Sequence, residues 1–312
     1  MNNPTPLNVI FMGTPDFAVP ALRTLHQSHH TIQAVVTVPD KQQGRGQREK
    51  PSAVKSAALE YNLPILQPGK LTDPDFIDAL KGFDPDLIVV VAFRILPEAV
   101  FSLPKYGSFN LHASLLPKYR GAAPIHWALL NGDSETGLTT FFLKRKVDTG
   151  NIIRQAKTPI LAEDNLQTLY EKLCHLGADL VLETANLISQ GAIVSGEQDN
   201  DLASPAPKVT SETRLMHFTE SANKCHNRVR AFAPKPGAYT YRDGVLLKLL
   251  LSRAVTGHGI PGTIIGISED SFTIACKEGA IEILSLQPES KKAMDVASYL
   301  RGNPFKIGET LG

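Results

Sequence analysis

The feature that most constrains the fold is a series of near-continuous apolar runs, rich in valine and isoleucine, in the first part of the 312-residue chain. Segments whose apolar residues recur at helical spacing lie between them, at residues 51–63 and 75–83. Apolar strands that alternate with helices are typical of a parallel sheet covered on both faces. We therefore expect a Rossmann-like α/β domain with a mostly parallel sheet. Its strands are predicted at residues 8–13, 32–38, 87–93 and 109–114.

One long helix is predicted at the end of this domain. Residues 165–189 place leucines every three or four positions, which forms one apolar stripe on a helix. Asp164 stands just before the first turn, where an acidic side chain caps free backbone N–H groups.

The pattern changes after this helix. Residues 196–208 (GEQDNDLASPAPK) combine acidic, small and proline residues without apolar periodicity, which indicates a connector. Short β-rich runs with glycine turns follow, and they predict a small β-barrel of the oligonucleotide-binding type. We expect a first domain at residues 1–196, a linker at 197–207 and a second domain at 208–312.

The two parts differ in charge. Residues 208–312 contain 14 lysines and arginines against 10 acidic residues, whereas residues 1–207 contain 18 against 21. Ordinary solubility explains such a difference, but a net charge of +4 on the second part also suits a polyanionic partner.

Several classes of protein are disfavoured. The three cysteines are far apart and lack a CxxC pair, so neither a disulfide framework nor a structural zinc is expected. The first apolar run begins at Asn8 and no run reaches membrane-spanning length, which favours a cytoplasmic protein without a membrane partner. The loop GTPDF after the first strand does not match GxGxxG, so nicotinamide and flavin binding are disfavoured.

A polar stretch, NLHASLLPKYRGAAP at residues 110–124, interrupts the apolar pattern. Asn110 and His112 are two apart on a predicted strand, so their side chains share one face. Ligands of open parallel sheets bind at the carboxyl ends of the strands, where these two residues are expected. A lone strand histidine is more often structural, and Ser114 lacks the GxSxG context of a nucleophile.

A carboxylate partner for His112 is available in VDTGN, residues 147–151. Asp148 follows the apolar run 137–143, which is predicted to be the next strand. It could cap its own turn, as aspartates in glycine-containing turns do. If it instead lies beside His112, it favours the charged imidazolium and orients the ring. Asparagine, histidine and aspartate without a nucleophilic serine or cysteine suit direct transfer between two bound substrates.

These stretches together resemble the methionyl-tRNA formyltransferase family, within the folate-dependent formyltransferases. The resemblance runs from about residue 8 to about residue 294 and rests on six motifs. They are NVIFMGTPDFAVPAL, PDKQQGRGQREKPSAVK, NLHASLLPKYRGAAPI, VDTGNII, RAFAPKPGAYT and LSLQPESKKAM. One stretch departs from the family pattern: VVVAFRILP lacks a glycine and one more residue between its aromatic residue and ILP, so that Arg94 stands there.

The resemblance implies formyl transfer from 10-formyltetrahydrofolate to initiator methionyl-tRNA, without a metal. It implies that Asn110, His112 and Asp148 are catalytic and that Ser114, Leu115, Leu116 and Pro117 line the folate site. It also implies that the basic loop with Lys41, Arg45, Arg48 and Lys50 meets the acceptor end of the tRNA. Lys208, Arg228, Arg230, Lys235, Lys291 and Lys292 could add backbone contacts.

Two other functions compete with this interpretation. A formyltransferase for a small amine, such as glycinamide ribonucleotide or an amino sugar, or a hydrolase that releases formate, would use the same three residues. A non-catalytic RNA-binding protein could keep the fold, although the intact Asn110, His112 and Asp148 argue against it. The basic second domain favours the tRNA enzyme. Nothing in the sequence requires an oligomer, and we expect a monomer.

Overall fold

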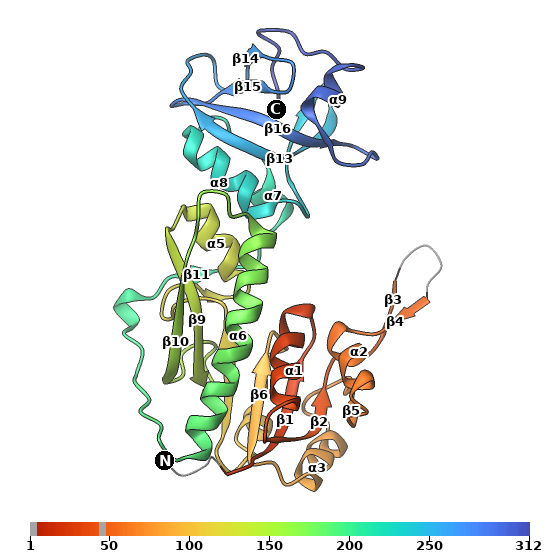
Figure 1. The fold of residues 1–312 in the computed structure, drawn as a ribbon, viewed down its shortest axis with the longest axis vertical. Helices are drawn as coiled ribbons and strands as arrows, with labels where there is room; N and C mark the ends of the chain where they lie inside the picture. Colours follow the sequence, from red (N-terminus) through yellow and green to blue (C-terminus); the bar gives the residue numbers. More distant parts are fainter. Residues whose placement is uncertain (1–4, 44–47) are drawn as a thin grey trace. The chain divides into compact units, whose positions relative to one another are not determined.

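The computed structural model describes residues 5–43 and 48–312. The described chain forms two compact units (Figure 1). The first unit comprises residues up to 121, 137–158 and 170–205, and the second comprises 122–136, 159–169 and 206–312. The chain thus enters the second unit twice before the segment expected to be the linker. The domain boundaries at 197–207 stay a prediction.

The first unit is built on a seven-stranded sheet with the order β10-β9-β7-β6-β1-β2-β5. From β5 to β7 all neighbouring strands are parallel, and β9 is antiparallel to β7. The expectation of a mostly parallel sheet is therefore confirmed. The strands are β1 (Asn8–Gly13), β2 (Thr31–Val36), β5 (Ile65–Leu66), β6 (Leu87–Val91), β7 (Ser108–His112), β9 (Glu135–Phe142) and β10 (Ile152–Pro159).

Helices explain why the central strands are apolar on both sides. Ile10 and Ile88 pack with Phe76 and Leu80 of helix α3 in one buried cluster. On the other face, Gly177 of helix α6 brings its backbone close to Leu111 of β7. The helices of this unit are α1 (Val19–His26), α2 (Ala53–Glu60), α3 (Pro74–Gly82), α4 (Glu98–Phe101) and the long α6 (Leu166–Ser189), which also enters the second unit.

The start of α6 corrects one prediction. The side chain of Asn165, not Asp164, accepts hydrogen bonds from the first free N–H groups, those of Gln167 and Thr168. The Asp164 carboxylate instead accepts from Leu161 N at 2.8 Å and from the Thr168 hydroxyl at 3.0 Å. The cap is displaced by one residue because the buried Asp164 closes the turn that precedes the helix.

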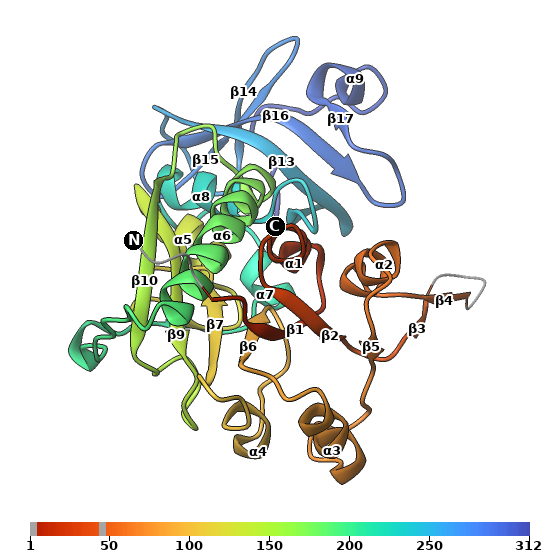
Figure 2. The ribbon, with the colours of Figure 1, turned by 60° about the horizontal axis from the view of Figure 1, so that its bottom comes forward.

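The second unit contains an antiparallel sheet with the order β12-β13-β16-β15-β14, and β17 pairs with β16. Strands β13 to β17 are labelled in Figure 2. Closure of this sheet into a barrel stays a prediction. Its strands are β12 (Ala238–Arg242), β13 (Val245–Val255), β14 (Ile264–Ile267), β15 (Phe272–Ala275), β16 (Ala280–Pro288) and β17 (Met294–Asp295). Its helices include α5 (Pro124–Asn131), α7 (Ser211–Arg214), α8 (Ala222–Phe232) and α9 (Val296–Leu300).

The remaining elements are short. They are η1 (Asp16–Ala18), β3 (Lys41–Gln43), β4 (Arg48–Lys50), β8 (Arg120–Gly121), η2 (Asn200–Leu202) and β11 (Pro205–Ala206). Strands β3 and β4 form an antiparallel pair that extends away from the seven-stranded sheet (Figures 1 and 2).

His226 of α8 makes the stability of the second unit depend on pH. Its Nδ1 lies 3.0 Å from the Ser252 hydroxyl, and burial, with the Arg230 charge nearby, lowers the pKa of His226 to about 4. Between that value and the ordinary pKa of about 6.5, the unfolded chain binds a proton that the folded chain does not. The free energy of unfolding is therefore highest above pH 6.5, where His226 is neutral in both states, and it decreases as the pH falls toward 4.

We therefore expect His226→Gln to flatten the fall in the free energy of unfolding between pH 7 and pH 5. Urea titrations of both proteins at the two pH values measure it. An equally steep fall in the variant would show that His226 does not carry this dependence.

Candidate active site

His112 is the last residue of β7 and is buried, with 6% of its surface exposed. Its Nε2 lies 2.8 Å from the backbone oxygen of Tyr119. A carbonyl oxygen only accepts hydrogen bonds, so Nε2 carries a hydrogen and donates it. The other ring nitrogen, Nδ1, therefore holds a lone pair in the neutral ring and becomes a second N–H donor when the ring is protonated.

Asp148, in the turn between β9 and β10, brings a carboxylate to this ring. Its Oδ2 lies 3.9 Å from His112 Nδ1, and the two side chains are 11% and 7% exposed. The expected adjacency of the two residues is confirmed. This separation is too long for a hydrogen bond, so the two side chains form an ion pair only when the ring carries a proton on both nitrogens. Gly121 N donates a 2.9 Å hydrogen bond to the same oxygen and fixes the carboxylate.

The turn that carries Asp148 is tightly constrained. Asp148 has a φ of 54°, in the left-handed region that aspartate tolerates better than most residues. Two residues later, a β-carbon on Gly150 would lie 1.5 Å from the backbone oxygen of Phe142. The Asp148 carboxylate accepts its hydrogen bond from Gly121, a residue of another segment, so its role extends beyond its own turn.

Asn110 completes the predicted group. It lies on β7 opposite Val90 of β6 and Phe141 of β9, and it is half-buried. Being two residues from His112, it faces the same side of the sheet. Leu111 between them faces α6, so the two polar side chains face away from that helix. The amide offers two N–H donors and an oxygen acceptor to a ligand.

The segment after β7 is held by two residues that the sequence did not single out. The Thr139 hydroxyl donates to Ser114 O at 2.7 Å and accepts from Leu116 N at 3.0 Å. Gln155 Nε2 donates to Leu116 O at 2.8 Å. Thr139 is in β9 and Gln155 is in β10, which are far from this loop in the sequence. Only the folded sheet brings them beside the loop, so no local sequence signal identifies them.

The four residues predicted to line the folate site differ in exposure. Ser114 is fully buried and donates its hydroxyl to Lys118 O at 2.6 Å, which also agrees with its interpretation as a turn residue. Leu116 is 3% exposed. Leu115 and Pro117 are half-buried, so they are the two that can touch a bound ligand in this conformation.

The other sequence features belong to other segments of the chain. Lys41 is in β3 and Arg48 and Lys50 are in β4, whereas Arg45 lies outside the described residues. Arg94, in the stretch that departs from the family pattern, donates to the backbone oxygens of Pro68 at 2.9 Å and Gly69 at 3.1 Å. It therefore ties the loop after β6 to the segment before α3.

Within residues 5–43 and 48–312, no three histidine, cysteine, aspartate or glutamate side chains gather closely enough to hold a metal ion. In the same residues, no helix combines the length and apolar character needed to cross a bilayer.

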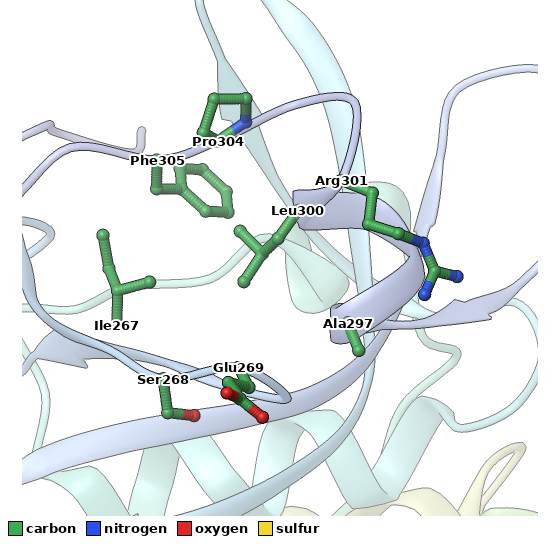
Figure 3. A pocket seen from close by; sticks show the side chains of 8 residues that line it. All are labelled: Ile267, Ser268, Glu269, Ala297, Leu300, Arg301, Pro304 and Phe305. Carbon is green, nitrogen blue, oxygen red and sulfur yellow. The ribbon is translucent and has the colours of Figure 1, made fainter.

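A cavity of about 500 Å³ opens in the second unit. Ile267, Leu300 and Phe305 point toward its centre, while the Arg301 guanidinium points outward (Figure 3). It is lined by the second unit alone and contains none of the predicted site residues.

Comparison with known proteins identifies relatives over nearly the whole chain. Residues 7–185 match the family profile described as formyl transferase, and residues 208–304 match the formyl transferase C-terminal domain. A methionyl-tRNA formyltransferase of Citrifermentans bemidjiense is 42% identical over 99% of this chain and 97% of its own length. Another, from Chlorobium phaeovibrioides, is 45% identical over 99% of both chains.

A solved structure shares the fold. The N-formyltransferase of Helicobacter canadensis, in complex with folinic acid and dTDP-3-aminofucose, has a TM-score of 0.64 at 22% identity. The similarity covers 89% of this chain and 98% of that protein.

Gly150 provides a test of the turn that carries Asp148. Gly150→Ala forces a β-carbon against the Phe142 carbonyl, so we expect a loss of about 1–3 kcal/mol in the free energy of unfolding. Gly82→Ala in α3 is the control, because its β-carbon meets no atom within 4 Å. It should keep or slightly raise stability. Equal unfolding free energies for the two variants in urea titrations would show that the backbone at Gly150 has room for a β-carbon.

Proposed function

The chain belongs to the methionyl-tRNA formyltransferase family, and we propose that it transfers the formyl group of 10-formyltetrahydrofolate to the amino group of initiator methionyl-tRNA. The observation that carries this function is the 42–45% identity to methionyl-tRNA formyltransferases over 99% of the chain. The contact between His112 and Asp148 at the end of β7 supports the chemistry. Asn110, His112 and Asp148 all come from one chain, and the proposal includes a monomeric enzyme that acts in the cytoplasm.

The reaction joins the α-nitrogen of methionine to the formyl carbon and breaks the bond between that carbon and N10 of the folate. Negative charge develops on the formyl oxygen in the transition state. Asn110 donates an amide N–H to this oxygen, and protonated His112 donates Nδ1–H, because Nε2 is already bonded to Tyr119. A donor of this kind stabilises a transition state by about 3–4 kcal/mol.

Asp148 has two roles in this mechanism. Its negative charge lies 3.9 Å from Nδ1 and offsets the positive charge of the ring that donates Nδ1–H. Its carboxylate also assists movement of the proton that the attacking amine loses and the departing N10 gains. The folate lies along Leu115 and Pro117, the half-buried pair of the loop after β7.

The acceptor is the part of the proposal that separates this chain from enzymes for small amines. The 42–45% identity to methionyl-tRNA formyltransferases over 99% of the chain, which includes the formyl transferase C-terminal domain at residues 208–304, supports methionyl-tRNA as the acceptor. We propose that this basic domain holds the tRNA backbone, and that Lys41, Arg45, Arg48 and Lys50 meet its acceptor end.

The first experiment is an acceptor comparison. Purified protein is incubated with 10-formyltetrahydrofolate and methionyl-tRNA, glycinamide ribonucleotide, a dTDP-amino sugar or no acceptor, and N-formyl product and formate are measured. We expect formyl-methionyl-tRNA alone. Product only with a small amine, or formate without acceptor, would overturn the assigned acceptor while leaving the site intact.

Variants of the site should separate catalysis from binding. Asn110→Ala and Asp148→Asn are expected to lower kcat by about 10²–10³-fold, because each removes transition-state stabilisation. The Kd for methionyl-tRNA should change less than about threefold, since neither side chain is among the lysines and arginines proposed to contact the tRNA. Lys146→Ala, an exposed residue near the same turn, is the control and should keep kcat. An unchanged kcat in Asn110→Ala would contradict its role.

A further inference from the structure

The segment at residues 196–204, expected from its composition to be a plain connector, is bonded to the candidate active site at both of its ends. Gly196 and Ile152 exchange two backbone hydrogen bonds, of 2.8 and 3.0 Å, at the start of β10. Ser204 accepts from Tyr119 N through its hydroxyl at 2.9 Å and from Arg120 N through its carbonyl at 2.8 Å. The segment therefore spans from the Asp148 turn to the segment that contacts His112.

Gln198 lies in the middle of this segment and is 9% exposed. Its Nε2 donates to Asp148 O at 2.9 Å and to Gly150 O at 2.8 Å. Its Oε1 accepts from Arg120 Nε at 3.0 Å and from Arg120 Nη2 at 2.7 Å. Both amide hydrogens and both acceptor positions are thus in use, so the side chain has one orientation that satisfies all of them.

These bonds join the two segments that hold the catalytic pair. Arg120 follows Tyr119, whose carbonyl accepts from His112, and precedes Gly121, whose N–H donates to Asp148. Gln198 binds Arg120 on one side and the backbone of Asp148 on the other. A shift of either segment would change the separation of the carboxylate and the imidazole.

We propose that Gln198 is a positioning residue for formyl transfer: it tethers the Asp148 turn to Arg120 and so holds the Asp148 carboxylate facing His112 Nδ1. This inference rests on the proposed function. Gln198 touches no reacting atom in this mechanism and acts through Asp148, because a small misplacement of a catalytic group lowers the rate strongly.

The tether can be cut without changing the size of the side chain. Gln198→Glu keeps oxygens that accept from Arg120, but it replaces the donor to Asp148 O and Gly150 O with an acceptor that repels both carbonyls. We expect kcat with methionyl-tRNA to fall about 10–100-fold, while KM for methionyl-tRNA and for 10-formyltetrahydrofolate stays within about twofold. Gln190→Glu, which adds the same charge at an exposed position after α6, should leave all three constants unchanged.

A double-mutant cycle identifies the route of the effect. If Gln198 acts through Asp148, Gln198→Glu should cost less than about twofold in kcat when Asp148→Asn is already present. The same 10–100-fold loss in both backgrounds would overturn the proposal. Full kcat in Gln198→Glu, or a rise in KM with unchanged kcat, would also overturn it. So would a circular dichroism spectrum showing that the variant is unfolded at the assay temperature, because the loss of activity would then come from loss of the fold.

The test also separates this inference from the proposed function. If the wild-type protein gives no formyl-methionyl-tRNA, the proposed function fails and the inference falls with it. If the wild type is active and Gln198→Glu matches it, only the role of Gln198 is overturned.

Discussion

The hydrogen bond from His112 Nε2 to the Tyr119 carbonyl is the contact on which the rest of the site depends. It commits one ring nitrogen to the protein and leaves Nδ1 toward the Asp148 carboxylate. Because the backbone N–H of Gly121 holds that same carboxylate, one three-residue segment fixes both partners. Electrostatic stabilisation of a transition state requires such fixed donors, since they need no reorganisation during the reaction.

The sheet decides which side of the first unit carries this chemistry. Side chains alternate along β7, so Leu111 faces α6 while Asn110 and His112 face the opposite side. Gly177 lets the long helix approach Leu111 closely, with 2.8 Å between the position of a β-carbon and that side chain. The face of the sheet that packs against α6 therefore stabilises the fold, while the opposite face of β7 presents Asn110 and His112.

The segment at 196–204 shows how composition can mislead about the role of a connector. Its residues are mostly polar or acidic and η2 (Asn200–Leu202) is its one short helix, yet several of its hydrogen-bonding groups bind other segments of the first unit. Gln198 has no apolar periodicity or motif that marks it, because its partners are backbone carbonyls and Arg120, 48 to 78 residues away in the sequence. Contacts of this kind exist only in the folded chain.

The sequence by itself determined the mostly parallel sheet, the long helix, an asparagine and a histidine on one face of a strand and an aspartate in a polar turn, because apolar periodicity and turn composition are local properties. It misplaced the cap of α6 by one residue, since burial of Asp164 is a tertiary effect. Only the tertiary structure decided that Asp148 meets His112, that Nδ1 is the ring nitrogen that faces it and that Gln198 joins their segments. These facts depend on distances between segments far apart in the chain, which no local pattern encodes.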